Sequence, residues 1–117
     1  MITYRFAERD DIPVILSLVR ALAAYEHMED AVVATPALYE DWLFEKKTAR
    51  VILAFDGDDA VGFALFFYNF STWLGRGGIY LEDLFVLPEH RGKGYGKAIL
   101  KKLASIALER NCGRMEW

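Results

Sequence analysis

The sequence has 117 residues, of which 54% are hydrophobic and 26% charged, with a formal net charge of −3. A chain of this size can bury one hydrophobic core, and its apolar content is too high for a disordered chain. Its one cysteine, Cys112, excludes an intramolecular disulfide and fits the reducing cytoplasm. No secretory signal opens the chain, and its most apolar stretch, Ala60–Phe70, falls short of the roughly 20 residues of a membrane helix. We therefore expect a single cytoplasmic domain over residues 1–117 with no membrane partner.

The charge is unevenly distributed along the chain. Residues 1–90 hold 15 Asp or Glu and 7 Lys or Arg, a balance of −8, whereas residues 91–117 hold 7 Lys or Arg and 2 Glu, a balance of +5. An acidic region suits a cationic partner and a basic region suits an anionic one, although clumped surface charge without a ligand is the alternative. We expect no nucleic-acid partner, because phosphate backbones favour positive charge spread over the whole surface.

The first half of the chain predicts a strand, two helices and a second strand. Ile2–Phe6 alternates as a short strand. Apolar residues then recur at helical spacing as far as about Tyr25, and Pro13 is tolerated in the first turn of this helix. A second, shorter helix is predicted from Pro36 to about Glu45, and Arg50–Phe55 reads as a strand.

Turns at Asp56–Asp59 and Gly75–Gly78 divide the second half of the chain. The segments after them predict a strand over 60–70, a strand over 79–87, a helix over 94–110 and a short strand over 114–117. The first of these is nearly all apolar, as in a strand covered on both faces. The order βααβββαβ with hairpin-linked strands predicts an α/β (α+β) fold, in which a mixed, mostly antiparallel sheet carries helices on both faces.

The most informative segment is a glycine-rich turn between a strand and a helix. Glycine lets the backbone approach a ligand closely, and a helix N-terminus offers N–H donors and a positive dipole end. Together they predict an anion site suited to phosphate. The P-loop and dinucleotide patterns fail here, whereas the spacing Arg-x-x-Gly-x-Gly fits at Arg91, Gly94 and Gly96. A tight strand–helix connection whose glycines only relieve crowding is the alternative.

This spacing resembles the pyrophosphate-binding turn of the GNAT superfamily of acetyl-CoA-dependent N-acetyltransferases, and the element order agrees with the first part of that fold. Residues 25–30 (YEHMED), 71–76 (STWLGR) and 79–86 (IYLEDLFV) are similar to the diamine branch, the spermidine/spermine and thialysine N-acetyltransferases. The resemblance covers essentially the whole chain. It implies a homodimeric enzyme that transfers an acetyl group from acetyl-CoA to a primary amine of a small polyamine or lysine-like diamine, by direct attack and without an acyl-enzyme.

The resemblance also implies the binding residues. Those for acetyl-CoA are the strand residues Leu84, Phe85 and Val86, which contact the pantetheine, and the turn residues Arg91, Gly92, Lys93, Gly94, Tyr95, Gly96 and Lys97, which hold the pyrophosphate. Those for the amine substrate are Tyr25, Glu26, Glu82, Trp73 and, as a weaker candidate, Glu116. For Trp73, a loop aromatic packed on the core is the alternative.

Glu82 is the catalytic residue that the resemblance implies, and its position offers a physical reason. It lies between Leu81 and Leu84 in a predicted strand, where desolvation is expected to raise its pKa. A carboxylate so tuned accepts a proton from an ammonium group, directly or through water. Asp83 is expected to point to the opposite face and to have a structural role. A carboxylate that caps a loop or pairs with an arginine is the alternative for Glu82.

Other chemistry is not expected. His27 and His90 are isolated, without metal-ligand spacing, so we expect both at the surface and no metal site. Cys112 has no basic partner near it in the pattern and is not expected to be a nucleophile. Proteins of the resembled family continue past the position of Trp117 with an Asn-containing segment and a Tyr that acts as general acid. We therefore expect a fold truncated before its last helix and strands, and a catalytically impaired CoA-binding remnant or regulatory module is the alternative function.

Overall fold

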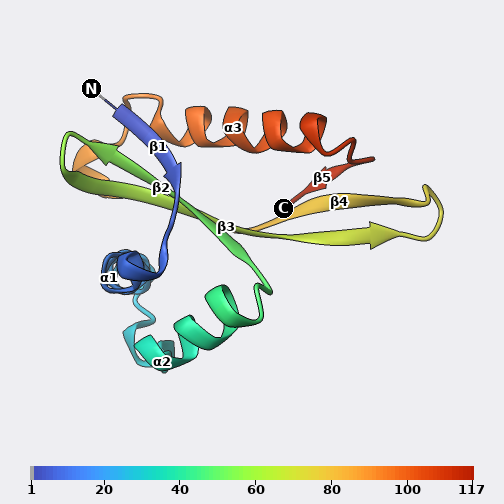
Figure 1. Ribbon diagram of the computed structural model, residues 1–117. Helices are drawn as coiled ribbons and strands as arrows, with labels where there is room; N and C mark the ends of the chain where they lie inside the picture. The colour runs from blue at the N-terminus through green and yellow to red at the C-terminus, as the bar shows by residue number, and fades with distance from the viewer. Residues whose placement is uncertain (1) are drawn as a thin grey trace.

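The computed structural model describes residues 2–117 and contains a five-stranded sheet with helices on both faces (Figure 1). The strands are β1 (Ile2–Phe6), β2 (Arg50–Asp56), β3 (Asp59–Ser71), β4 (Arg76–Val86) and β5 (Met115–Glu116). They lie side by side in that order, and every neighbouring pair is antiparallel except the parallel pair of β4 and β5. The predicted mixed, mostly antiparallel sheet is thus confirmed.

The helices are α1 (Ile12–Tyr25), α2 (Pro36–Tyr39) with the π-helical turn η3 (Glu40–Glu45), and α3 (Tyr95–Glu109). The second predicted helix is therefore present but divided into two kinds of turn. Its start follows the expected chemistry, because Thr35 Oγ1 accepts a hydrogen bond from the Leu38 N–H at 3.2 Å. No helix within residues 2–117 is long and apolar enough to cross a membrane.

The two faces of the sheet have separate cores. Alternate residues of a strand point to opposite faces, so neighbours in β2 belong to different clusters. The cluster on the α1 face contains Ile15, Leu18, Val51, Leu53, Phe63 and Phe85, and the cluster on the α3 face contains Ile52, Ala54, Val61, Ala64, Phe66, Ile79, Leu81, Ile99 and Leu103. Figure 1 shows α3 on one side of the sheet and α1 with α2 on the other, which confirms the prediction of helices on both faces.

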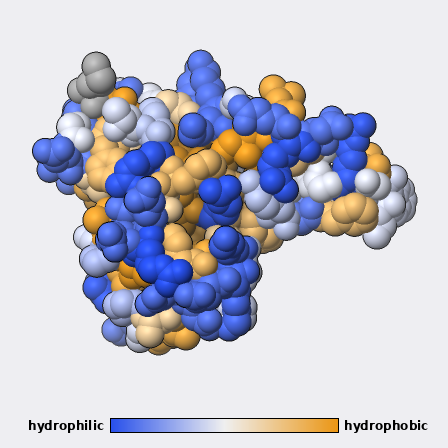
Figure 2. Space-filling view, in the orientation of Figure 1, coloured by the Kyte–Doolittle hydropathy of each residue, from blue (hydrophilic) through white to orange (hydrophobic). Residues whose placement is uncertain are grey.

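The hairpin of β3 and β4 extends beyond the other strands (Figure 1). The first residue of β2, Arg50, pairs with Phe66, so β3 beyond Phe66 pairs with β4 alone. Phe70 is 63% exposed there, and the prediction that 60–70 is covered on both faces is wrong for this outer half. The physical reason is that β2 begins only at Arg50, so the outer half of β3 pairs with β4 alone and the two strands form an arm. In Figure 2 this arm projects from the body, and hydrophilic side chains cover much of the α1–α2 lobe.

A β-bulge interrupts the pairing of β3 with β4. Leu65 pairs with Asp83 and Phe66 with Leu81, so Glu82 is the extra residue on β4. Such a bulge leaves one residue outside the ladder and re-aims the side chains around it. Leu81 accordingly packs on the α3 side, whereas Phe85 packs on the α1 side.

Candidate active site

The glycine-rich turn forms the N-terminus of α3. Gly92 and Gly94 both have φ of 80°, a left-handed conformation that glycine adopts without strain. A Cβ atom at either position would have no atom within 4 Å, so open space lies against the backbone. The amide N–H groups in the first turn of a helix have no partner within the helix. The turn therefore presents donors and a positive dipole end to an open volume.

A cavity of about 380 Å³ lies between this turn and the end of β4. Its lining consists of Leu84, Phe85, Val86, His90, Arg91, Gly92, Gly94, Tyr95 and Gly96. All the residues predicted to bind the cofactor belong to this lining except Lys93 and Lys97, which are exposed near it in sequence. An apolar wall from β4 facing a donor-rich turn suits a ligand with an apolar arm and a phosphate group.

Arg91 links the turn to the end of α1. Its Nε donates a hydrogen bond to the Val86 carbonyl oxygen at 3.0 Å. Its guanidinium carbon lies 4.2 Å from the ring centre of Tyr25 and 5.5 Å from that of Phe85. Tyr25 was predicted to contact the substrate and Arg91 the cofactor, so the structure brings one residue of each set into direct contact.

A second cavity, of about 390 Å³, opens where β4 and β5 separate. The two strands pair only through Ile79 with Met115 and Tyr80 with Glu116. The residues that line this cavity are Leu81, Glu82, Leu84, Leu100 and Trp117. Leu84 of β4 lines both cavities, so the cavity beside the donor-rich turn and the cavity lined by Glu82 share one wall residue.

Glu82 is exposed, which corrects the prediction that it is desolvated within a strand. The reason is the bulge, which takes Glu82 out of the regular alternation of β4. The half-buried carboxyl is instead Asp83, and burial raises the pKa of Asp83. The negative charges of Glu82 and Glu26 raise this pKa further. Burial and the charge of Asp83 likewise raise the pKa of Tyr39, which belongs to α2.

Glu26 and Glu82 both lie near enough to Asp83 to raise its pKa, and we call the three residues the acidic cluster. The resemblance had placed Glu26 and Glu82 together at the amine site, whereas Asp83 was expected to have a structural role. For Asp83, the only signal in the sequence was the pair of adjacent acids in β4. A cluster of carboxylates attracts a cationic group, and a carboxyl whose pKa is raised accepts a proton more readily.

Trp73 and Glu116 do not line the cavity of Glu82. Trp73 is 96% exposed near the tip of the β3–β4 hairpin, so it neither packs on the core nor shares a cavity with Glu82. Glu116 Oε1 accepts a hydrogen bond from Asn69 Nδ2 at 3.0 Å and lies 3.1 Å from Arg114 Nε. The Glu116 carboxylate therefore ties β5 to β3.

His90 differs from the prediction of a surface residue. It is half-buried in the lining of the turn cavity, and its Nδ1 is buried without a hydrogen-bond partner among the described residues. A buried unpartnered ring nitrogen beside a cavity can be satisfied by a polar group of a ligand. Across residues 2–117, no three or more His, Cys, Asp or Glu residues are placed to hold a metal ion.

Comparison with known proteins agrees with this geometry. The chain is 38% identical over 120 residues to the thialysine N-epsilon-acetyltransferase of Bos taurus, covering 95% of this chain and 70% of that protein. It is 35% identical to the human spermidine/spermine N(1)-acetyltransferase-like protein 1, covering 97% of this chain and 17% of that protein. A solved Clostridium acetobutylicum protein, described as a predicted acetyltransferase with acetyl-CoA, has the same fold at a TM-score of 0.81 and 21% identity, covering 98% of this chain and 79% of that one.

The model of the acetyltransferase (GNAT) family matches residues 15–117, which include most of α1, the sheet from β2 onward, the turn and α3. The match therefore contains both cavities of β4 and all three members of the acidic cluster. The chain belongs to the GNAT family of acetyltransferases.

Proposed function

We propose that the chain transfers an acetyl group from acetyl-CoA to a primary amine of a small polyamine or lysine-like diamine. The observation that carries this proposal is the donor-rich turn at the start of α3, whose cavity adjoins through Leu84 the cavity lined by Glu82. The similarity to a thialysine and a spermidine/spermine-like acetyltransferase supports the substrate class.

The proposed cofactor residues are the ten predicted ones, from Leu84–Val86 and Arg91–Lys97. Two features of this chain fit the pyrophosphate of CoA: N–H donors at the start of α3, and open space over Gly92 and Gly94. The pantetheine would lie along the end of β4, where backbone and apolar side chains line the cavity. Acetyl-CoA supplies the acetyl group as a thioester.

The proposed substrate residues are Tyr25, Glu26 and Glu82, with Trp73 and Glu116 kept as weaker candidates. The acidic cluster attracts the protonated amine and orients it. Glu82 is exposed, so it can take the ammonium proton through a water molecule and leave the neutral amine as nucleophile.

The test is an acetyl-transfer assay with acetyl-CoA and spermidine, spermine, thialysine, lysine and ornithine as separate acceptors. We expect turnover with at least one diamine, and a fall in kcat of about 10²-fold or more in Glu82→Gln, as for the loss of a general base. Glu109→Gln removes an exposed carboxylate at the far end of α3 and serves as the matched control, with an unchanged rate.

Two outcomes would contradict the proposal. Unchanged rates in Glu82→Gln remove Glu82 from the chemistry. Binding of acetyl-CoA without transfer to any amine favours the alternative of a CoA-binding module. The homodimer, the single domain over residues 1–117 and the cytoplasmic location stay predictions, and light scattering after size exclusion tests the first of them.

A further inference from the structure

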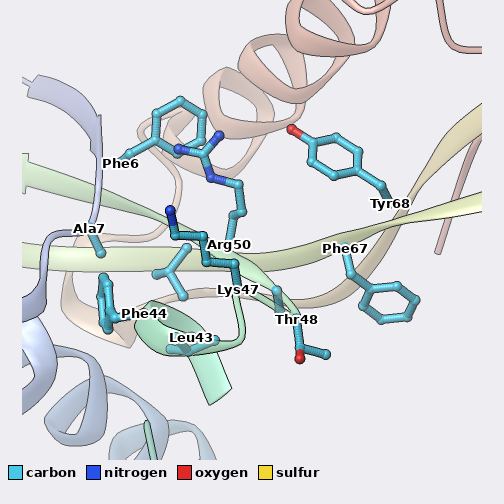
Figure 3. Close-up of a pocket in the computed structure, with 11 residues that line it drawn as sticks. Phe6, Ala7, Leu43, Phe44, Lys47, Thr48, Arg50, Phe67 and Tyr68 are labelled. Carbon is cyan, nitrogen blue, oxygen red and sulfur yellow. The ribbon is translucent and has the colours of Figure 1, made fainter. Parts of the chain in front are cut away.

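A third cavity, of about 420 Å³, lies away from the proposed transferase site (Figure 3). Its lining consists of Phe6, Ala7, Leu43, Phe44, Lys47, Thr48, Ala49, Arg50, Val51, Phe67 and Tyr68. It shares no lining residue with the two cavities of β4. We call it the edge cavity, because it forms where β2 begins at Arg50 and leaves the outer half of β3 unpaired on that side. Its volume falls within the range of small-molecule sites, about 300–1,000 Å³.

Aromatic side chains form part of the wall of the edge cavity, and residues outside the cavity pack against two of them. The Phe67 ring stacks on Tyr80, with 5.2 Å between ring centres and 21° between planes. The Tyr68 ring contacts the Phe66 ring edge-on, with 5.8 Å between ring centres. The guanidinium carbon of Arg110 lies 3.9 Å from the centre of the Tyr68 ring. Side chains held in this way need little ordering when a ligand binds, which favours recognition of a flat apolar body.

The charged groups of the edge cavity are both positive. Figure 3 shows the Lys47 amino group and the Arg50 guanidinium reaching toward the same region beside the Phe6 ring. The Arg50 guanidinium lies 3.9 Å from that ring centre, and no Asp or Glu is in the lining. Within the described residues 2–117, neither cation forms an ion pair, whereas the nearby Arg5, Arg9 and Lys46 each pair with an acid.

The backbone around Lys47 points to a ligand of low charge. Lys47 has φ of 53°, the left-handed conformation that ends η3, as it does at His27 after α1 and at Asn111 after α3. The backbone N–H groups of Lys46 and Thr48 already donate to the carbonyl oxygens of Asp41 and Trp42. The side-chain cations are therefore the main donors, in contrast to the amide-rich turn that suits phosphate.

We propose that the edge cavity binds a small aromatic carboxylate. Its carboxylate would lie between Lys47 and Arg50, and its ring would lie against Phe6 and Tyr68, which both pack on the α3-face core. A carboxylate matches the fork of an arginine, and the otherwise unpaired positive charge gains a partner. This site stands independently of the proposed acetyl transfer.

The test is a titration followed by ¹H–¹⁵N NMR spectra of the whole chain, with three ligands that separate ring from charge. Indole-3-acetate carries both features, tryptamine carries the same ring with a positive charge, and acetate carries the charge alone. We expect indole-3-acetate to bind with the largest shifts at the amides of Lys47, Thr48 and Phe67, and at least about tenfold more tightly than either control, since each loses one set of contacts.

Variants provide the second arm. Lys47→Gln with Arg50→Gln removes both charges at nearly constant size and should weaken indole-3-acetate binding about tenfold or more, whereas Lys46→Gln, outside the lining, should leave it unchanged. Equal binding of all three ligands, or shifts elsewhere in the chain, would overturn the proposal. So would displacement of indole-3-acetate by acetyl-CoA, or shifts of the same amides on dilution alone, which would indicate a second copy of the chain as occupant. If the double variant fails to fold, the three-ligand comparison on the unaltered chain decides alone.

Discussion

The left-handed conformation of Gly94 allows the stability of the fold to be separated from cofactor binding. With φ of 80° and no atom within 4 Å of an added Cβ, Gly94→Ala meets no steric clash, and its cost comes from the backbone alone. Left-handed backbone is unfavourable for an L residue, but alanine also lowers the conformational entropy of the unfolded chain, which offsets part of this cost. Together the two effects should lower the free energy of unfolding by about 1 kcal/mol. For a domain near this size, such a loss lowers Tm by about 4 °C.

Gly57→Ala is the matched control, because Gly57 also has positive φ, at 63°, and open space around its Cβ position. It lies in the turn between β2 and β3, away from the proposed site. We expect both variants to lose similar Tm in thermal unfolding followed by circular dichroism. Calorimetric titration should show that only Gly94→Ala weakens acetyl-CoA binding, by about tenfold or more, because the methyl group obstructs the approach of phosphate to the amides. Equal acetyl-CoA affinity in the two variants would refute this reasoning.

Three more results follow from the structure. Asp83→Asn should raise the free energy of unfolding in urea at pH 7 but not at pH 3. Burial lifts the pKa of Asp83 above its ordinary 3.8, so the protonated carboxyl stabilises the folded state and this stabilisation is lost as pH rises through the folded-state pKa. At pH 7 the neutral Asn side chain therefore replaces a charged, half-buried carboxylate. An equal gain at both pH values contradicts this. Phe63→Ala should cost about 3–5 kcal/mol of unfolding free energy in the same assay, and Phe70→Ala far less, since Phe63 is fully buried and Phe70 is 63% exposed. Trp73→Ala should leave Tm nearly unchanged in thermal unfolding, because its side chain is 96% exposed; a large drop would mean the hairpin tip is packed.

The turn and its helix could be predicted from the sequence because local rules specify them. Alternating glycines between a strand and a helix predict a turn that a ligand can approach closely, and the structure has open space over Gly92 and Gly94. The helix boundary at Tyr95 lies one residue from the prediction. The cavity beside the turn follows from these local features, and most of the residues that the resemblance implied for the cofactor line it.

The environment of Glu82 could not be predicted in the same way. Regular alternation predicts burial for a residue inside a strand, but the bulge depends on how Leu65 and Phe66 pair with β4. Pairing register is a non-local property, set by the packing of both faces. The burial of Asp83 and its coupling to Glu26 and Glu82 therefore emerged only with the fold.

The edge cavity shows the same limit. Its residues come from the ends of β1 and β2, from η3 and the loop after it, and from β3, and no sequence motif joins them. The sequence places Lys47 and Arg50 only relative to a predicted helix and strand. That neither has an acidic partner within residues 2–117 is visible only when the neighbouring ion pairs of Arg9 and Lys46 are placed in space.

Titration of the ¹⁵N-labelled chain with acetyl-CoA tests most directly the proposal that the turn before α3 binds this cofactor. We expect saturable shifts that are largest at the amides of Gly92, Gly94, Tyr95 and Gly96, with smaller shifts at the end of β4. No saturable shift, or shifts centred on Lys47 and Thr48 in the edge cavity, would contradict it.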